Sequence, residues 1–111
     1  MKILNQYPVN LDRREAYKLT EAASVKKMAE AAGSTLNPDA WILYEVLDNK
    51  TGEMKTVLVI RDGEEIFGTI SKTFIQAFVK AAEFFENEIG AIKVIEGTTK
   101  AGRKYITCEL A

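Results

Sequence analysis

The chain lacks histidine altogether and has a single cysteine among its 111 residues. Histidine is the commonest general base and metal ligand in proteins, so its absence argues against zinc sites and serine-histidine catalysis. The lone Cys108 has no partner for a disulfide within the chain, and its place in an alternating strand pattern predicts a small buried apolar residue. The glycines do not follow the spacing of a phosphate-binding loop. We therefore expect a protein that is not an enzyme and that needs no metal and no cofactor.

Long apolar runs and a strong net charge are missing as well. No segment approaches the roughly 18 consecutive apolar residues of a membrane-spanning helix. Residues 1–10 include polar side chains and Pro8, where a secretory signal needs a continuous apolar stretch. These absences predict a cytoplasmic protein without a membrane partner. The net charge of −1 provides no overall attraction for nucleic acid, so such binding must rest on a local basic surface.

Apolar residues make up 47% of the sequence, enough to build the core of one domain. Residues 1–14 show no sustained period and are expected to form an N-terminal arm or an edge strand, with a single domain over 15–111. Within that domain, the pattern predicts a short strand over 15–20 and a helical segment over 25–32 that Gly33 closes. Further strands are expected over 40–47, 54–61, 65–70, 91–96 and 103–110.

One long amphipathic helix is expected after Ser71, whose hydroxyl is suited to cap the first turn. Phe74, Phe78 and Phe85 recur at helical spacing, which predicts one buried aromatic face, and Gly90 ends the pattern. A mainly β chain with one long helix before its last two strands has the element order of an OB-fold, a five-stranded, partly open barrel. An α+β sheet with one helix packed across it is the alternative.

Alternation along the strands separates a candidate core face from a candidate binding face. Ile42, Leu58 and Ile60 are assigned to the core side. Tyr44 belongs to the same side by parity, and a bulge in its strand would turn it outward. The opposite side interleaves aromatic and basic side chains. Single-stranded nucleic acid needs this combination, because rings stack on bases and cations follow phosphates.

The loop over 97–102 and the start of the last strand form the most basic local stretch of the chain. In an OB-fold this loop flanks the binding face, and Lys26 and Lys27 would lie in the loop on the other side. The candidate nucleic-acid-binding residues are therefore Trp41, Tyr44, Lys55, Arg61, Phe67, Lys100, Arg103, Lys104 and Tyr105.

Several short motifs follow one another in a recognisable order. They are the Ser24-Val25-Lys26-Lys27 segment, the strand that contains Tyr44, the Asp62-Gly63 turn, Phe67 ahead of Ile70-Ser71-Lys72-Thr73, and Gly97-Thr98 followed by Lys100 and Gly102. Through these motifs, residues 24–110 resemble the single-stranded DNA-binding proteins of protein-primed Bacillus phages. The resemblance implies an OB-fold protein that coats displaced single strands during replication, with stacking roles on Tyr44 and Phe67. The family's tyrosine in the turn after the second strand has no counterpart over 49–53.

Two classes of function follow from these observations. The first is a non-sequence-specific single-stranded DNA-binding protein of phage or mobile-element replication and recombination, acting in the cytoplasm of a bacterial host. The second is an OB-like protein–protein interaction module or virion-associated structural protein, in which the same aromatic patch packs on another chain. Self-association and the preference between DNA and RNA are left open.

Overall fold

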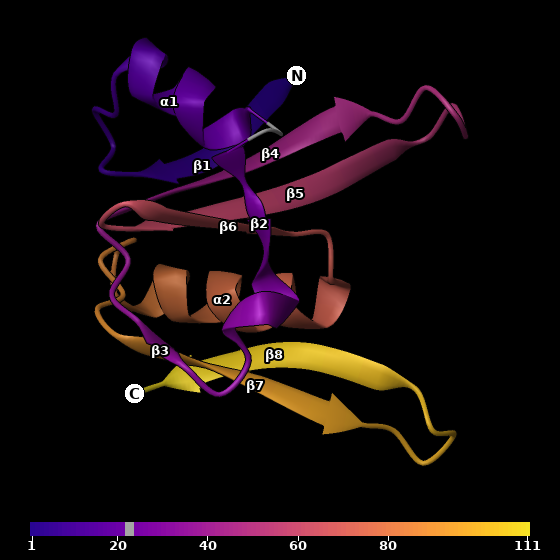
Figure 1. The fold of residues 1–111 in the computed structure, drawn as a ribbon. Coiled ribbons are helices and arrows are strands. Elements are labelled where there is room, and N and C mark those ends of the chain that lie inside the picture. Colours follow the sequence, from indigo (N-terminus) through magenta and orange to yellow (C-terminus); the bar gives the residue numbers. More distant parts are fainter. Residues whose placement is uncertain (22–23) are drawn as a thin grey trace.

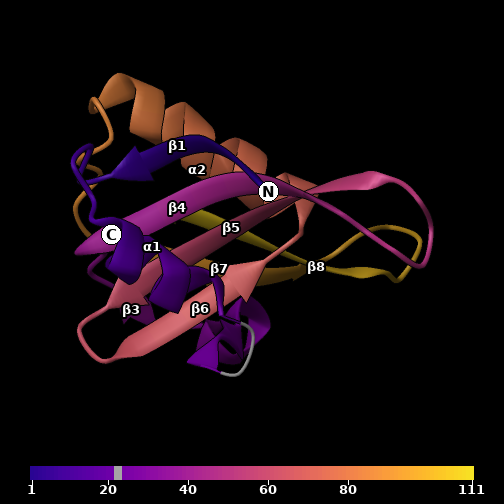
Figure 2. The same ribbon diagram turned by 90° about the horizontal axis from the view of Figure 1, so that it is seen from above.

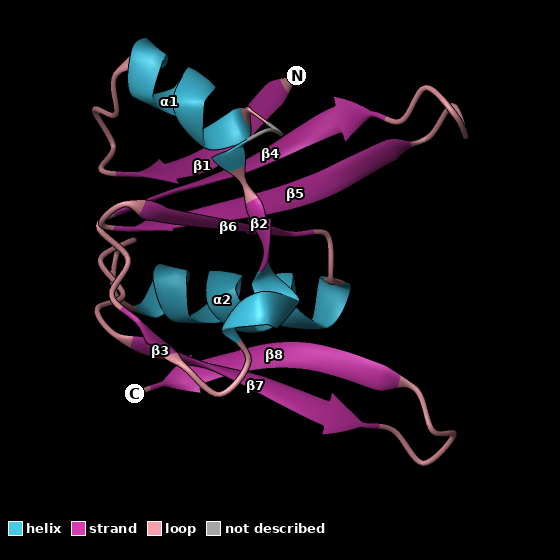
Figure 3. Ribbon diagram, viewed as in Figure 1, coloured by secondary structure: helices cyan, strands magenta, loops and turns pink. Residues whose placement is uncertain are grey.

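The computed structural model describes residues 1–21 and 24–111 (Figure 1, Figure 3). Its strands are β1 (Lys2–Tyr7), β2 (Lys26–Lys27), β3 (Thr35–Leu36), β4 (Ala40–Leu47), β5 (Met54–Asp62), β6 (Glu65–Thr69), β7 (Ile92–Thr98) and β8 (Lys104–Leu110). Its helices are α1 (Arg13–Thr20), the 3₁₀ helix η2 (Met28–Ala31) and α2 (Lys72–Phe84). Among the described residues, no helix combines the length and the apolar character needed to cross a bilayer.

The strands form two sheets on either side of α2 (Figure 1). The larger sheet has the order β1-β4-β5-β6-β2, and the smaller one has the order β3-β7-β8. Neighbouring strands are antiparallel except β2 and β6, which run parallel. Figure 2 looks onto the face that α1 covers and shows β1, β4, β5 and β6 side by side in that order.

The expected five-stranded barrel is replaced by two open sheets. The mainly β character is confirmed, but no strand pairing among the described residues joins the larger sheet to the smaller one. The link that would close the barrel is the segment from β2 to β3, which crosses between the sheets. It pairs over only two residues with β6 and over two with β7, because η2 interrupts it. The expected helix content is also corrected, because the described residues include a second α-helix, α1, on the opposite side of the larger sheet from α2.

Strong local signals placed most elements correctly. β4 has the expected bounds, and β5, β6, β7 and β8 differ from them by one or two residues. The cap of α2 is confirmed, because the Ser71 hydroxyl accepts a hydrogen bond of 3.2 Å from the backbone N–H of Phe74. The helical segment expected over 25–32 shrinks to η2, and Gly33 follows it with a φ of +85°.

The strand expected over 15–20 is wrong, because these residues belong to α1. Asp12 caps this helix and accepts a hydrogen bond of 2.7 Å from the backbone N–H of Arg14. Ala16 and Leu19, three residues apart, are buried against the larger sheet, whereas Tyr17 is exposed. Over only six residues, helical spacing of apolar residues resembles the alternation of a strand. The helix-capping Asp12 upstream is the signal that distinguishes a helix from a strand here. Residues 2–7 pair with β4 as the edge strand β1.

The main core lies between the larger sheet and α2. Trp41 packs edge to face on Phe78 with ring centroids 5.1 Å apart, and Phe74 stacks on Phe78 at 6.5 Å. All three rings are fully buried. Phe85, expected on the same buried stripe, is 38% exposed because α2 ends at Phe84. A second cluster fills the other face of the sheet under α1 and includes Leu19.

Asn87 ties the end of α2 to the sheet. Glu86 and Asn87 adopt left-handed φ values of 53° and 73°. The turn that results presents the Asn87 carbonyl to the indole N–H of Trp41, which donates a hydrogen bond of 3.1 Å. The Asn87 side chain exchanges two hydrogen bonds, of 2.8 and 3.1 Å, with that of Asn5 in β1. The helix end therefore contacts both β1 and β4.

Candidate nucleic-acid interface

The nine candidate residues do not share one surface. The register of β4 with β5 differs from the expected one, so residues expected on one face lie on opposite faces. Tyr44 lies opposite Val57 and Val46 opposite Lys55, so these side chains share the face that α1 covers. Trp41 lies opposite Ile60 and points with it toward α2. The predicted alternation within each strand is correct. The predicted pairing of the strands is wrong, because Ile60 shares the face of Trp41 and not that of Tyr44. A shift of one residue in register exchanges the two faces of a strand.

Trp41 and Phe67 cannot stack on bases, because both rings belong to the core. Trp41 is 1% exposed and Phe67 is 5% exposed. The only polar group of Trp41 already donates to Asn87. Its fluorescence therefore reports the state of the core rather than contact with a ligand.

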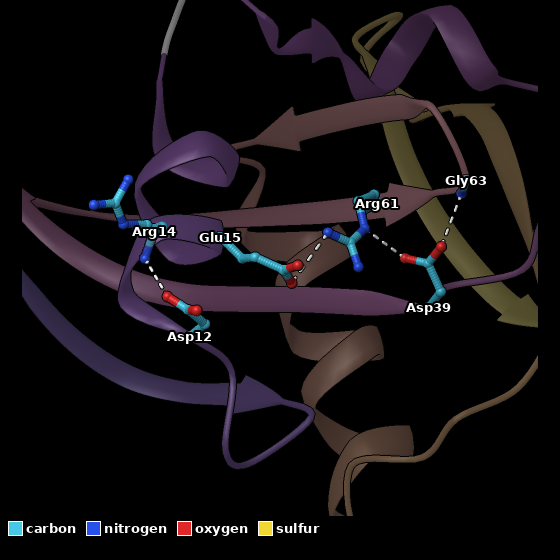
Figure 4. Close-up of polar contacts among 6 residues, drawn as sticks. All are labelled: Asp12, Arg14, Glu15, Asp39, Arg61 and Gly63. Atoms are coloured by element: carbon cyan, nitrogen blue, oxygen red, sulfur yellow. Dashed lines mark hydrogen bonds and ion pairs between the residues drawn. The ribbon is translucent and has the colours of Figure 1, made fainter.

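Arg61, expected on phosphates, is held by two carboxylates of its own chain (Figure 4). Its Nε donates to Asp39 Oδ1 at 2.7 Å, and its Nη1 lies 3.5 Å from Glu15 Oε2. The other oxygen of Asp39 accepts from the backbone N–H of Gly63 at 3.0 Å. The hydrogen bond that Arg61 donates to Asp39 is the main reason that the pKa of Arg61 is raised. Arg61 thus joins α1 to the β5–β6 turn, and its charge is already compensated.

The hairpin of β7 and β8 carries the remaining basic candidates. Lys100, Arg103 and Lys104 are all exposed at its tip. Tyr105 lies opposite Gly97, and its ring covers that glycine so closely that a side chain at position 97 would collide with it. Tyr105 is 38% exposed. One face of the ring therefore lies on Gly97, and part of the ring is open to solvent.

An apolar groove of about 640 Å³ lies on the α1 side of the larger sheet. Its volume falls within the range of about 300–1,000 Å³ typical of ligand sites. Two candidates, Tyr44 and Lys55, lie in it. The remaining lining comes from the first residue, the end of α1, the segment from β2 into η2, the outer face of β4 and β5, the end of β6 and β8. These residues are Met1, Thr20, Val25, Lys26, Lys27, Met28, Ala29, Val46, Val57, Val59, Gly68, Thr69, Ile70 and Ile106.

The groove is basic and apolar at once. Three lysines line it, Lys26, Lys27 and Lys55, and no carboxylate is among the described residues that do so. The Lys26 ammonium belongs to a second hollow, because its Nζ lies 3.3 Å from Glu65 Oε2 and 5.9 Å from the centre of the Phe67 ring, and both residues line that hollow. Tyr44 is 9% exposed, and burial raises the pKa of its phenol. The tyrosine therefore leaves little of its ring free for stacking on a base.

The sequence did not place Lys26 and Lys27 beside Lys55. The contact that brings them there is the close packing of Val25 on Gly68, where a Cβ at position 68 would lie 2.7 Å from Val25 Cγ1. The parallel pairing of β2 with β6 follows from this approach. Gly68 within a predicted strand is the signal available in the sequence, because glycine in a strand often marks a close approach of backbone or side chain.

A second hollow, between η2 and β6, has the opposite character. Its lining includes Glu30, Asp62 and Glu65 together with Lys26. The described residues include no group of three or more histidine, cysteine or acidic side chains placed to hold a metal ion. Acidic side chains repel phosphate, so the groove is the better candidate for nucleic acid.

Comparison with protein-family models, with curated proteins and with solved structures yields no match for this chain. The arguments about its function therefore rest on the groove and the hairpin themselves.

Cys108 is expected to react slowly with alkylating agents. Burial raises the pKa of its thiol to about 11, from an ordinary value of 9.0. Because the thiolate is the reactive form, its fraction at pH 8 falls about 100-fold. Iodoacetamide labelling followed by mass spectrometry should show this slow rate in the native protein and a normal rate in urea. Equal rates in both conditions would contradict the burial of Cys108.

Proposed function

We propose that the groove binds single-stranded DNA without sequence preference, in phage or mobile-element replication within a bacterial cytoplasm. One observation carries the proposal: in a chain of net charge −1, Lys27 and Lys55 line an apolar groove whose described lining has no carboxylate, and Lys26 stands between this groove and the second hollow. The lysines would contact phosphates, and the apolar walls would receive unstacked bases.

The basic hairpin extends this site. Ile106 lines the groove, and Lys104 lies two residues away on the same side of β8. A strand leaving the groove along β8 would therefore meet Lys104, then Lys100 and Arg103 at the tip. Tyr105 points to the other side of the hairpin, and its open ring face would stack on a base that passes around the tip.

This proposal treats the two sheets as an open form of the OB-fold, with the segment from β2 to β3 in place of the strand that bridges them. Burial of Trp41 and Phe67 removes both the aromatic patch of an interaction module and the base stacking expected on these two rings. Binding of single-stranded DNA keeps the groove and the basic hairpin, whereas the interaction module has lost its surface. Single-stranded DNA binding therefore has the stronger support from the geometry.

Lys55→Glu is expected to weaken binding of fluorescein-labelled oligothymidylate about tenfold at low salt, because it reverses a charge at the groove. Fluorescence anisotropy measures the affinity, and it should fall further as salt is raised. Duplex DNA, whose base faces are already stacked, should bind more weakly.

Arg13→Glu is the matched control for this experiment. It makes the same change of charge at the exposed first residue of α1, outside the groove. Its affinity should stay within about twofold of the unmodified protein, as expected for an isolated surface charge. Equal losses in both variants, or no binding by the unmodified protein at low salt, would overturn the proposal.

A further inference from the structure

The end of α2 exposes two aromatic rings among acidic residues. Phe84 is 81% exposed and Phe85 38% exposed, and their rings meet edge to face at 4.9 Å. Glu83, Glu86 and Glu88 flank them, and all three are exposed. Among the described residues, none of these glutamates forms an ion pair. We call residues 83–88 the acidic knob.

The knob is held in one conformation. The backbone N–H of Phe85 closes the helix on the carbonyl of Ala81 at 3.0 Å, and the two left-handed residues that follow are secured by the bonds of Asn87 to Trp41 and Asn5. A preformed apolar surface loses little conformational entropy on binding. Two adjoining exposed rings form a contiguous apolar patch, and such a patch with a polar rim is typical of an interaction site.

The groove is opposite to the knob in charge, and both surfaces are apolar. It offers apolar walls with Lys27 and Lys55, and no carboxylate among its described lining residues, whereas the knob offers two phenyl rings and three glutamates that form no ion pair within the described part of the chain. We propose that the acidic knob of one copy of this chain docks in the groove of a second copy. Opposite charges at the rim would orient the contact, and burial of Phe84 would supply most of its affinity.

The knob cannot enter the groove of its own chain. Ile70, just before α2, lines the groove, and Phe84 is the last residue of that helix. A helix of 13 residues is about 20 Å long, and Figure 1 shows α2 ending on the opposite side of the molecule from the loop that follows β6. The contact is therefore head to tail. Each copy keeps one free knob or groove, so association extends into chains rather than stopping at a dimer, unless a ring closes.

The contact is small, so we expect weak association that grows with protein concentration. Sedimentation velocity on the full chain at low salt should show a weight-average sedimentation coefficient that rises with concentration and falls when salt is added. Phe84→Ser and Lys55→Glu should each abolish the rise, whereas Arg13→Glu should keep it. Circular dichroism checks that each variant is folded.

Mixing the two defective variants provides the sharpest test. Phe84→Ser retains a groove and Lys55→Glu retains a knob, so a head-to-tail contact predicts that the mixture forms a complex of two chains and nothing larger. A monomeric unmodified protein at high concentration, unchanged association of Phe84→Ser, or no complex in the mixture would each overturn the proposal.

A competition experiment with DNA tests whether the knob and DNA share the groove, and this experiment rests on the proposed function. Saturating oligothymidylate should disperse the chains, because knob and DNA occupy one site. Chains that persist with DNA bound would overturn the shared site. If oligothymidylate does not bind at all, the proposed function fails, while the variant and mixing experiments still decide the docking of the knob.

Discussion

Phe78→Ala is expected to lower the free energy of unfolding by about 3–5 kcal/mol, the usual cost of removing a buried phenyl ring. Phe78 is fully buried and contacts both Trp41 and Phe74, so its removal leaves a cavity between α2 and the larger sheet. Such a loss is comparable to the whole stability of many domains of this size. Urea titration followed by circular dichroism measures it. The emission of Trp41 should also move to longer wavelength, because its aromatic neighbour is gone.

Phe84→Ala is the control on the same helix. It makes the same substitution at a ring that is 81% exposed, so its free energy of unfolding should change by less than about 0.5 kcal/mol. Similar losses at both positions would show that α2 does not bury the face assigned to it.

Asn87→Ala is expected to destabilise the protein by about 2–3 kcal/mol. The substitution removes the two hydrogen bonds to the Asn5 side chain and the one that Asn87 Nδ2 donates to the Gln6 carbonyl, and it places alanine at a φ of 73°. A left-handed conformation costs an ordinary L-residue about 1–2 kcal/mol, whereas asparagine and glycine tolerate it. Thermal and urea unfolding measure the loss.

Two companion variants separate these causes. Asn87→Gly loses the side-chain hydrogen bonds, but glycine adopts the left-handed φ without strain. Asn5→Ala loses the two bonds with Asn87 and the one that Asn5 Oδ1 accepts from the Gln6 N–H, whereas the bond from Asn87 to the Gln6 carbonyl stays. Both should be less destabilised than Asn87→Ala, by about 1 kcal/mol. If Asn87→Ala and Asn87→Gly unfold alike, the left-handed turn carries no cost and the reason given for asparagine at this position is wrong.

Elements with strong local signals could be predicted from the sequence. β4 and β5 flank a turn with asparagine and glycine, and Ser71 with a helical repeat of phenylalanines marks α2. Weaker signals failed. Residues 15–20 are too few to distinguish helical spacing from alternation, and η2 replaced a longer helix because the segment around it crosses between sheets.

The candidate site was predicted only in part. Lys55 and Tyr44 lie in the groove and the basic hairpin is exposed, but Trp41 and Phe67 are buried. Arg61 illustrates a further limit. Its partners Asp39 and Glu15 come from other elements, so the local sequence shows a free cation where the fold makes an ion pair.

The sequence by itself determined the type and order of most elements and the alternation within each strand, because these depend on residues a few positions apart. It also determined that histidine and disulfide chemistry are unavailable to the chain. Only the tertiary structure decided which face of β4 and β5 meets α2, since that choice depends on the pairing register and on helices from distant segments. For the same reason, only the fold brought Lys26 and Lys27 to Lys55 and set the acidic knob apart from the groove.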